Sequence, residues 1–313
     1  MRLVRHLSDL PYAALERGSV VTIGTFDGLH LGHQQLLDRV VSRARDTGMP
    51  SIVMSFEPMP KEFFAAERPP ARLTRFGEKF EELASRGIDI FYCPNFGRAM
   101  RSISAADFIR RILIHGLGTR HLVVGDDFHF ARHREGSIGH LIGASGALGY
   151  EVEQVPSVIV NGVRVSSSII REALASGDIR QATALLGRPY RMSGKIIEGE
   201  KLGRTLGFPT ANVELRRRLS AVMGVFAVRV EGLPGGPRDA VASVGTRPTF
   251  DGTKPVLEAH IFDFDEDIYG ETIHVDFIGY LRSTVKFEHV DELVAQMHCD
   301  ADNARSILAA DKA

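Results

Sequence analysis

The sequence predicts an α/β domain built on a doubly wound parallel sheet, followed by a smaller antiparallel β-barrel. Three observations predict this fold class. Over residues 19–155, short apolar runs alternate with amphipathic stretches at helical spacing. Glycine and proline interrupt the chain near residue 187, and beyond it short β-like runs follow one another with few helical patterns between them. We therefore place the first domain at residues 1–187 and the second at residues 188–313.

The elements of the first domain follow from local patterns. Apolar or β-branched runs predict strands at residues 19–24, 51–56, 88–93, 121–125 and 150–155. Amphipathic stretches predict helices at residues 32–47, 75–86 and 104–115. Gly87 follows the second helix as its stop residue, and Ser104 is the expected N-cap of the third. Strands that alternate with helices favour a parallel sheet.

The pattern changes in the last 130 residues or so. Residues 173–186 form one helical stretch, which Gly187-Arg188-Pro189 ends. Strands are expected at residues 190–197, 225–230, 240–244, 257–262 and 272–277, separated by glycine and proline. A closing helix is expected at residues 289–308. This spacing of short strands is typical of an antiparallel barrel.

The composition limits the kinds of partner that we expect this protein to bind. The formal net charge is −1 and 25% of residues are charged, so we expect a globular protein without the basic surface that coats nucleic acid. The two cysteines, Cys93 and Cys299, form no C-x-x-C spacing, which indicates reduced thiols in a cytoplasmic protein. We expect no secretory signal, and the sequence contains no apolar run of the roughly 20 residues that a membrane span needs. Small molecules are therefore the expected partners.

A glycine- and histidine-rich segment, GTFDGLHLGH, runs from Gly24 to His33 directly after a predicted strand. Ligands of open α/β sheets bind at the carboxyl ends of strands, and a helix N-terminus there favours phosphate. His30 and His33 can both point into one pocket and stabilise charge on a phosphate. The segment predicts a nucleotidyl-transfer site, against the alternative of structural histidines in a glycine turn. Its candidate residues are Gly24, Phe26, Asp27, Gly28, His30 and His33.

Two further clusters lie in the same half. Arg164, Ser167, Ser168 and Arg171 bring hydroxyl groups, a helix N-terminus and guanidinium groups together, as in a triphosphate grip. The alternative is a plain N-cap with an exposed arginine. Asp127 and Phe128 follow another strand and can bind a ligand hydroxyl or metal and stack on a ring. A turn with a core aromatic explains these two residues equally well.

The second half contains a loop with glycines at 199, 203 and 207, followed by Phe208-Pro209-Thr210-Ala211-Asn212. Gly203 and Gly207 allow close approach to a ligand, and Arg204 lies between them. Thr210 and Asn212 offer the oxygen ligands that suit Mg²⁺. The alternative is a flexible basic loop before a strand.

These segments resemble the bacterial bifunctional riboflavin kinase/FAD synthetases. The family pattern G-x-F-D-G-[VL]-H-x-G-H is matched from Gly24 to His33, S-S-[ST]-x-[IV]-R from Ser166 to Arg171, and the kinase signature at Pro209–Asn212. The resemblance implies a Rossmann-like nucleotidyltransferase domain followed by a six-stranded riboflavin kinase-like barrel with a C-terminal helix.

The resemblance also implies two reactions that use ATP and Mg²⁺. The barrel would phosphorylate riboflavin to FMN, and the first domain would adenylate FMN to FAD with release of pyrophosphate. The resemblance implies that His30, His33 and Glu258 are catalytic. It implies flavin contacts at Asp127 and Phe128 in the first domain and at Arg282 in the barrel. The metal ligands that it implies are Thr210 and Asn212. Two rivals are a single-activity nucleotidyltransferase whose barrel only binds flavin, and a flavin-sensing or carrier protein without turnover.

Several positions depart from common family patterns, namely Met59, Asp127, Ala131, Ser168 and Ser283-Thr284. Asp127 stands where asparagine is frequent, and Ala131 replaces a glycine that often follows the preceding aromatic.

Overall fold

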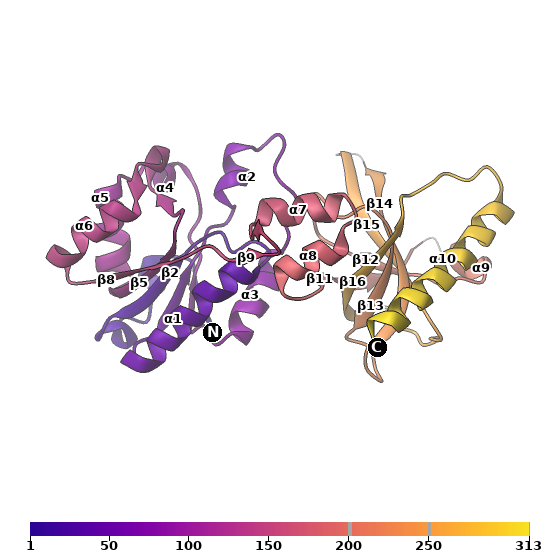
Figure 1. Cartoon of the computed structure of the whole chain (residues 1–313), viewed down its shortest axis with the longest axis horizontal. Coiled ribbons are helices and arrows are strands. Elements are labelled where there is room, and N and C mark those ends of the chain that lie inside the picture. The colour runs from indigo at the N-terminus through magenta and orange to yellow at the C-terminus, as the bar shows by residue number, and fades with distance from the viewer. Residues whose placement is uncertain (200–201, 250–251, 313) are drawn as a thin grey trace. The chain divides into compact units, whose positions relative to one another are not determined.

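The computed structural model describes residues 1–199, 202–249 and 252–312, and its contacts divide the chain into two compact units (Figure 1). The first unit comprises Met1–Pro70 and Phe76–Val165, and the second comprises Ala71–Arg75 and Ser166–Ala313. Residues 166–187, which the sequence assigned to the first domain, pack within the second unit. Among the described residues, no helix is both long and apolar enough to cross a membrane.

The first unit contains the predicted parallel sheet. Its strand order is β1-β4-β3-β2-β5-β8, and every neighbouring pair is parallel. The strands are β1 (Arg2–Val4), β2 (Ser19–Ile23), β3 (Ser51–Met54), β4 (Ile90–Tyr92), β5 (Thr119–Gly125) and β8 (Glu151–Val155). Later strands add on one side of β2 and then on the other, so the sheet has its topological switch point between β2 and β5.

Helices cover both faces of this sheet. They are α1 (Leu31–Thr47), α2 (Pro60–Phe64), α3 (Phe76–Ser85), α4 (Arg98–Ser102), α5 (Ala105–Asp107), which continues as a π-helical segment (Phe108–Gly116), and α6 (Ile138–Leu148). Two small hairpins pair β6 (His129–Phe130) with β7 (Gly136–Ser137), and β9 (Ile159–Val160) with β10 (Val163–Arg164). Short 3-10 turns occupy Leu7–Asp9, Tyr12–Leu15 and Arg132–Arg134.

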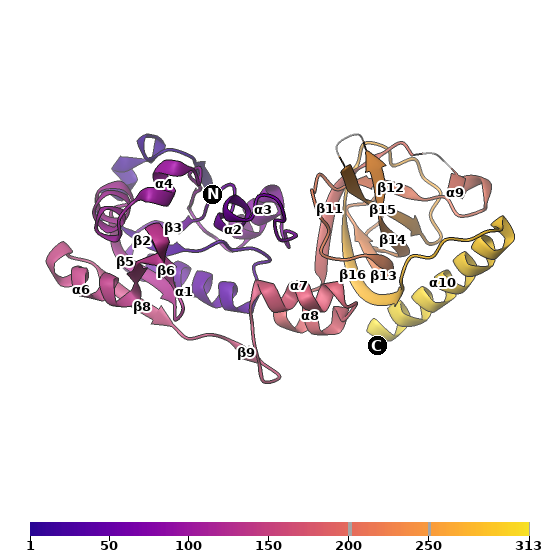
Figure 2. The same cartoon turned by 90° about the horizontal axis from the view of Figure 1, so that it is seen from above.

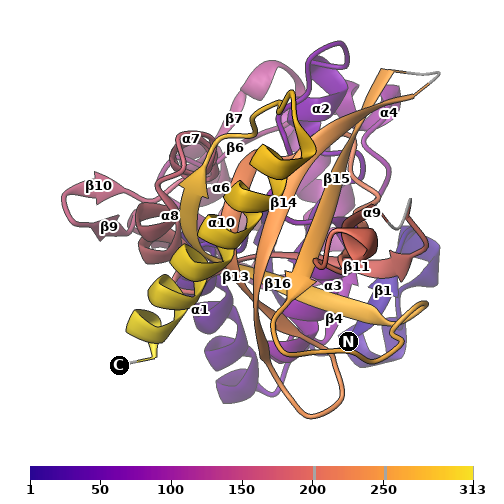
Figure 3. The ribbon, with the colours of Figure 1, turned by 90° about the vertical axis from the view of Figure 1, so that its right-hand side faces the viewer.

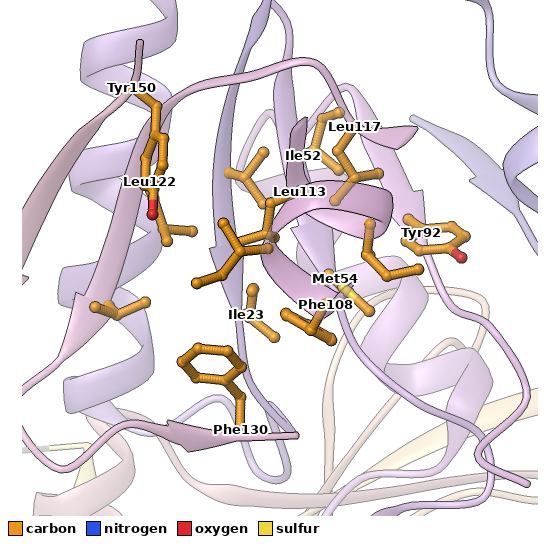
Figure 4. Packing of buried hydrophobic residues seen from close by; sticks show 14 of the residues in the cluster. Ile23, Ile52, Met54, Tyr92, Phe108, Leu113, Leu117, Leu122, Phe130 and Tyr150 are labelled. Atoms are coloured by element: carbon orange, nitrogen blue, oxygen red, sulfur yellow. The ribbon is translucent and has the colours of Figure 1, made fainter. Parts of the chain in front are cut away.

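Alternate residues of the buried strands supply two separate cores. Val21, Ile23 and Ile52 pack with Phe108 and Leu113 of the π-helical segment (Figure 4). On the opposite face, Val20, Val53, Phe91 and Val123 pack with helices α1 and α3. Side chains of successive strand residues point to opposite faces, so a sheet covered on both sides reads as an unbroken apolar run. The predicted doubly wound arrangement is confirmed.

The second unit opens with two helices, α7 (Ser167–Ala175) and α8 (Ile179–Leu186). The single helix that we expected over residues 173–186 is wrong, because Gly177 takes a φ of +81° and ends the helical course. The Asp178 side chain then accepts a hydrogen bond from the Gln181 amide and caps α8.

A closed six-stranded barrel follows, in the order β11-β12-β15-β14-β13-β16, with antiparallel neighbours throughout (Figure 2). Its strands are β11 (Tyr190–Ile197), β12 (Ala211–Glu214), β13 (Gly224–Glu231), β14 (Arg238–Thr249), β15 (Gly252–Ile261) and β16 (Thr272–Arg282). The short helix α9 (Leu202–Thr205) precedes β12. Helix α10 (Val290–Asp311) crosses β13, β14 and β16 (Figure 3), where Ala304 and Leu308 are fully buried. The predicted barrel and closing helix are confirmed.

Candidate functional sites

The glycine- and histidine-rich segment lies at the carboxyl end of β2. The segment Asp126–Phe128 follows the end of β5, the strand beside β2. Both segments therefore lie at the switch point of the sheet, where open α/β sheets bind their ligands. The Gly24 amide donates to the Met54 carbonyl oxygen at 3.1 Å, which keeps the start of the loop against β3.

The loop between β2 and α1 has an unusual backbone. Phe26 and Leu29 take φ values of +47° and +43°, a region that non-glycine residues rarely adopt, and Gly28 between them takes +85°. Phe26 and Leu29 are fully buried. Their packing in the core holds these conformations in place, which is how strained backbone persists at functional sites. A Cβ atom at Gly24 would lie 3.0 Å from the Phe26 ring, closer than ordinary van der Waals contact, so glycine leaves room for that ring.

His30 and His33 are brought together at the N-terminus of α1. Their rings stack with centroids 3.7 Å apart and an interplanar angle of 15°. His30 is the N-cap of the helix, because its Nδ1 atom accepts a hydrogen bond from the His33 amide at 3.3 Å. Nδ1 is thus unprotonated in the neutral ring, so the proton is on Nε2. The capping bond therefore sets the tautomer that can donate to a phosphate oxygen.

His33 is held neutral. Burial, the neighbouring His30 and the ammonium group of Lys79 all lower the pKa of His33 well below its ordinary value of 6.5. Phe26 contributes to the surroundings, with its ring centroid 5.0 Å from that of His33. A neutral imidazole can donate through one nitrogen while the helix N-terminus beside it favours an anion.

Lys79 is a residue that the sequence reasoning missed. It lies on α3 and is only 3% exposed, and its Nζ atom donates to the Thr25 carbonyl oxygen at 2.6 Å. A signal was present, because Phe76, Lys79, Phe80 and Leu83 follow the spacing of the apolar face of a helix. A lysine on such a face is buried and needs a partner.

Asp127 and Arg164 are also brought together in the first unit. Their side chains form an ion pair at 2.8 Å, and Arg164 donates from Nε to Ser157 Oγ at 2.9 Å. The neighbouring Asp126 carboxylate accepts bonds from the Ser157 hydroxyl and amide, which lower the pKa of Asp126. Two residues that the sequence analysis singled out, Asp127 and Arg164, thus share one polar cluster.

Phe128 serves the core at least in part. Its ring stacks on Phe130 with centroids 5.6 Å apart, and the half-buried side chain packs against the core that contains Phe108. The Phe128 amide donates to the Gly125 carbonyl oxygen at 3.2 Å, which closes a turn after β5.

The serine cluster lies on α7, in the second unit. Ser166 caps the helix by accepting from the Ile169 amide at 3.4 Å, so Ser167 and Ser168 form the first helical positions. The Arg171 guanidinium donates to the carbonyl oxygens of Ala71 at 2.6 Å and Ser167 at 3.1 Å. The predicted helix start is confirmed, and Arg171 is anchored by backbone groups on two separate segments.

The glycine loop of the barrel lies closely around Thr210 and Asn212. A Cβ atom at Gly203 would lie 3.2 Å from Thr210 Oγ1, and one at Gly199 would collide with the Asn212 amide group. Gly207 takes a φ of +82° at the turn that precedes this segment. Glycine at these positions lets the backbone form a close cradle around the side chains of Thr210 and Asn212. The side chain of Arg204 and residues 200–201 lie outside the described part of the loop.

Glu258 faces the same cradle. It pairs with Asn212 across β12 and β15, and opposed residues of antiparallel strands place their side chains on one face of the sheet. On its other side Glu258 pairs with Ser243 of β14. Arg247, also on β14, lies 3.5 Å from the Glu258 carboxylate. The barrel therefore brings together a carboxylate and an amide oxygen beside the Thr210 loop.

Arg282 ends β16 and is fixed by α10. Its guanidinium forms a two-pronged ion pair with Asp300, whose side chain is almost fully buried, with a shortest distance of 2.7 Å. The Phe287 ring lies 5.8 Å from the guanidinium carbon. Arg282 is thus held next to an aromatic ring, and its partner Asp300 was not singled out from the sequence.

Comparison with known proteins gives a consistent result for both halves. Residues 13–169 match the FAD synthetase family model, and residues 186–308 match the riboflavin kinase family model. The chain is 42% identical to the bifunctional riboflavin kinase/FMN adenylyltransferase of Escherichia coli K12 over 100% of its own length and 99% of that protein. It is 43% identical to the protein of that name from Pseudomonas fluorescens, covering 99% and 98% of the two chains.

One solved structure also aligns along the whole chain. A Streptococcus pneumoniae protein described as a macrolide-efflux protein matches with a TM-score of 0.82 and 32% identity, over 97% of this chain and 98% of that one. Both family matches and the full-length relatives cover the sheet unit and the barrel unit together. The chain belongs to the family of bifunctional riboflavin kinase/FMN adenylyltransferases.

Proposed function

We propose that the chain makes FAD from riboflavin in two ATP-dependent steps, one in each unit, and that the residues assembled above carry them. The barrel transfers the γ-phosphoryl group of ATP to riboflavin and yields FMN and ADP. The sheet unit then joins FMN to the AMP portion of a second ATP and yields FAD and pyrophosphate. The observation that carries the proposal is the presence of two separate phosphate-transfer constellations, at His30/His33 and at Thr210/Asn212/Glu258, in one chain.

In the adenylyl transfer, a phosphate oxygen of FMN attacks the α-phosphorus of ATP and the bond to pyrophosphate breaks. Negative charge develops on the α-phosphate oxygens, and the imidazoles of His30 and His33 stabilise it by donating hydrogen bonds. The capping bond to His30 Nδ1 supports this role because it keeps the proton on Nε2. Phe26, Asp27 and the glycines at 24 and 28 shape the pocket.

We assign Asp127 to the end of this site that faces FMN, and Arg164 to the phosphates of the nucleotide. Arg164 carries the positive charge that a phosphate needs, and Asp127 holds its guanidinium group in place at 2.8 Å. Phe128 lies beside them on the turn after β5 and offers an apolar ring for the flavin.

In the kinase reaction, the 5′-hydroxyl of riboflavin attacks the γ-phosphorus of ATP and ADP leaves. Glu258 accepts the hydroxyl proton as the new O–P bond forms. Gly203, Arg204 and Gly207 lie along the phosphates of ATP, and Arg282 with Phe287 borders the flavin. Mg²⁺ fits the oxygen atoms of Thr210 and Asn212, whose surroundings leave no room for a Cβ at Gly199 or Gly203. When bound, Mg²⁺ would neutralise charge on the ATP phosphates.

The proposal places both reactions in the cytoplasm, on small-molecule substrates, without a nucleic-acid or membrane partner. Its direct test uses one variant for each site. Glu258→Gln should lower ADP release with riboflavin and ATP by about 10²–10⁴-fold, the usual contribution of a general base. FMN-dependent pyrophosphate release should remain.

His30→Asn should lower FMN-dependent pyrophosphate release and leave ADP release with riboflavin unchanged. Asparagine is a good N-cap, so the helix start is kept while the Nε2 donor is lost. Removal of one such donor costs about 10²–10³-fold in the rate of adenylyl transfer. If either variant lost both reactions, or neither, the assignment of one reaction to each site would be wrong.

A further inference from the structure

Lys79 is a charged residue in the apolar layer beneath the His30/His33 site. It lies on the face of α3 whose neighbours Phe76, Phe80 and Leu83 pack against the sheet, with Phe76 stacked on Phe91 at 5.7 Å. Its side chain is 3% exposed. A buried ammonium group is costly unless it donates hydrogen bonds, so its presence in this layer calls for a role.

The ammonium group is directed at the backbone of the loop between β2 and α1. Lys79 Nζ donates to the Thr25 carbonyl oxygen at 2.6 Å, and Ser55 Oγ donates to the same oxygen at 3.2 Å. Ser55 is fully buried at the end of β3. The Thr25 carbonyl is thus held from two sides, by a helix and by the neighbouring strand.

The Thr25 carbonyl belongs to the peptide group that carries the Phe26 amide. Fixing this peptide plane fixes the start of the turn in which φ becomes positive at Phe26 and again at Leu29. The Phe26 ring then contacts His33, and His33 stacks on His30. An unbroken series of contacts therefore connects Lys79 to both imidazoles.

We propose that Lys79 is a positioning residue of the adenylyltransferase site, which holds the Thr25 carbonyl and through it keeps the loop from Thr25 to His30 in the geometry that presents the two imidazoles to ATP. The proposal rests on the role of His30 and His33 proposed above. Its ammonium group also adds a fixed positive charge near His33 and helps to keep that ring neutral.

Kinetics of four variants test the proposal. Lys79→Met keeps most of the apolar stem and removes the donor, Lys79→Arg restores a charged donor, and Ser55→Ala removes the second bond to Thr25. Lys61→Met is the matched control, because Lys61 is exposed on α2. Pyrophosphate release with FMN and ATP measures adenylyl transfer, and ADP release with riboflavin measures the kinase. Near-ultraviolet circular dichroism checks the fold.

A positioning role predicts a loss in kcat and little change in KM. Lys79→Met should lower kcat of adenylyl transfer at least tenfold and change KM for ATP less than threefold, and Lys79→Arg should recover part of kcat. Ser55→Ala should lower kcat about threefold, as expected for one weaker hydrogen bond. Kinase activity should stay unchanged in all four variants, and Lys61→Met should match wild type in both reactions.

An undiminished kcat in Lys79→Met, or a loss confined to KM for ATP, would overturn the proposal. If Lys79→Met does not fold, Ser55→Ala decides: unchanged kcat in a folded Ser55→Ala variant would refute the role of the Thr25 carbonyl. The His30→Asn variant distinguishes a failure of the proposed function from a failure of the role proposed for Lys79. Full adenylyl transfer in His30→Asn refutes the proposed function itself, whereas its loss there together with full activity in Lys79→Met refutes only the role of Lys79.

Discussion

His260 Nδ1 lies 2.8 Å from the Pro209 carbonyl oxygen. A carbonyl oxygen only accepts, so Nδ1 carries the proton and donates. His260 comes two residues after Glu258 on β15, and Pro209 precedes Thr210. The Phe208 ring, 5% exposed, lies between His260 at 5.1 Å and His298 at 4.8 Å. The strand that carries the proposed base thus also holds the proposed metal-binding loop.

This relationship predicts different effects for two similar substitutions. The amide nitrogen of asparagine can take the place of Nδ1, whereas that of glutamine reaches the place of Nε2. His260→Asn should retain kinase activity within about threefold, and His260→Gln should lose about tenfold in kcat/KM, since one hydrogen bond contributes about 1 kcal/mol. ADP release with riboflavin measures both, and adenylyl transfer should be unaffected. Equal losses in the two variants would show that the Pro209 bond does not matter.

Replacement of Ala131 by glycine should stabilise the first unit. Its backbone lies at φ +64° and ψ −176°, a region that is nearly exclusive to glycine. Relief of about 1–3 kcal/mol of strain outweighs the roughly 0.5–1 kcal/mol that glycine's freedom in the unfolded chain costs. Ala131→Gly should therefore raise the Tm of the first unit by a few degrees in calorimetry. Ala147→Gly, an exposed helical control on α6, should lower it.

The lowered pKa of His33 should make the first unit less stable in acid. Its pKa in the folded protein lies below that of the unfolded chain, because of burial, His30 and Lys79. As pH falls below about 6.5, the unfolded chain binds a proton that the folded site rejects, so stability falls by at most about 1.4 kcal/mol per pH unit. The loss ends below the folded pKa.

Calorimetry at pH 7.5 and 5.5 checks this prediction. The Tm of the first unit should drop less in His33→Gln than in wild type over this interval. The exposed His115→Gln variant should behave as wild type. An equal drop in wild type and His33→Gln would mean that His33 titrates normally in the folded protein.

Much of the fold could be predicted because its signals are local. Apolar strands alternating with amphipathic helices predicted the parallel sheet, and short strands with glycine between them predicted the barrel. The edge strand Arg2–Val4 was missed because three residues carry no periodicity and its partner, Ile90–Tyr92, is distant in the chain. The break between α7 and α8 had a local signal that was overlooked, namely Gly177 followed by Asp178.

The candidate site was predicted in its residue types but not in its contacts. The spacing of His30 and His33 indicated one pocket, yet their stacking and the tautomer of His30 depend on the bond to the helix amide. One partner of Arg171 is the carbonyl oxygen of Ala71, one hundred residues earlier in the chain. Asp300 lies 18 residues after Arg282 on another element. Such pairings arise from packing, which sequence patterns do not contain.

The central claim is that two separate sites in this chain act in succession on the flavin. It is tested most directly by a chromatographic time course that starts from riboflavin, ATP and Mg²⁺ with the two site variants. His30→Asn alone should stop at FMN, and Glu258→Gln alone should leave riboflavin unchanged. An equal mixture of the two should form FAD, since FMN released by one variant is the substrate of the other. FAD formation at the wild-type rate by either variant alone, or no FAD from the mixture, would contradict the account.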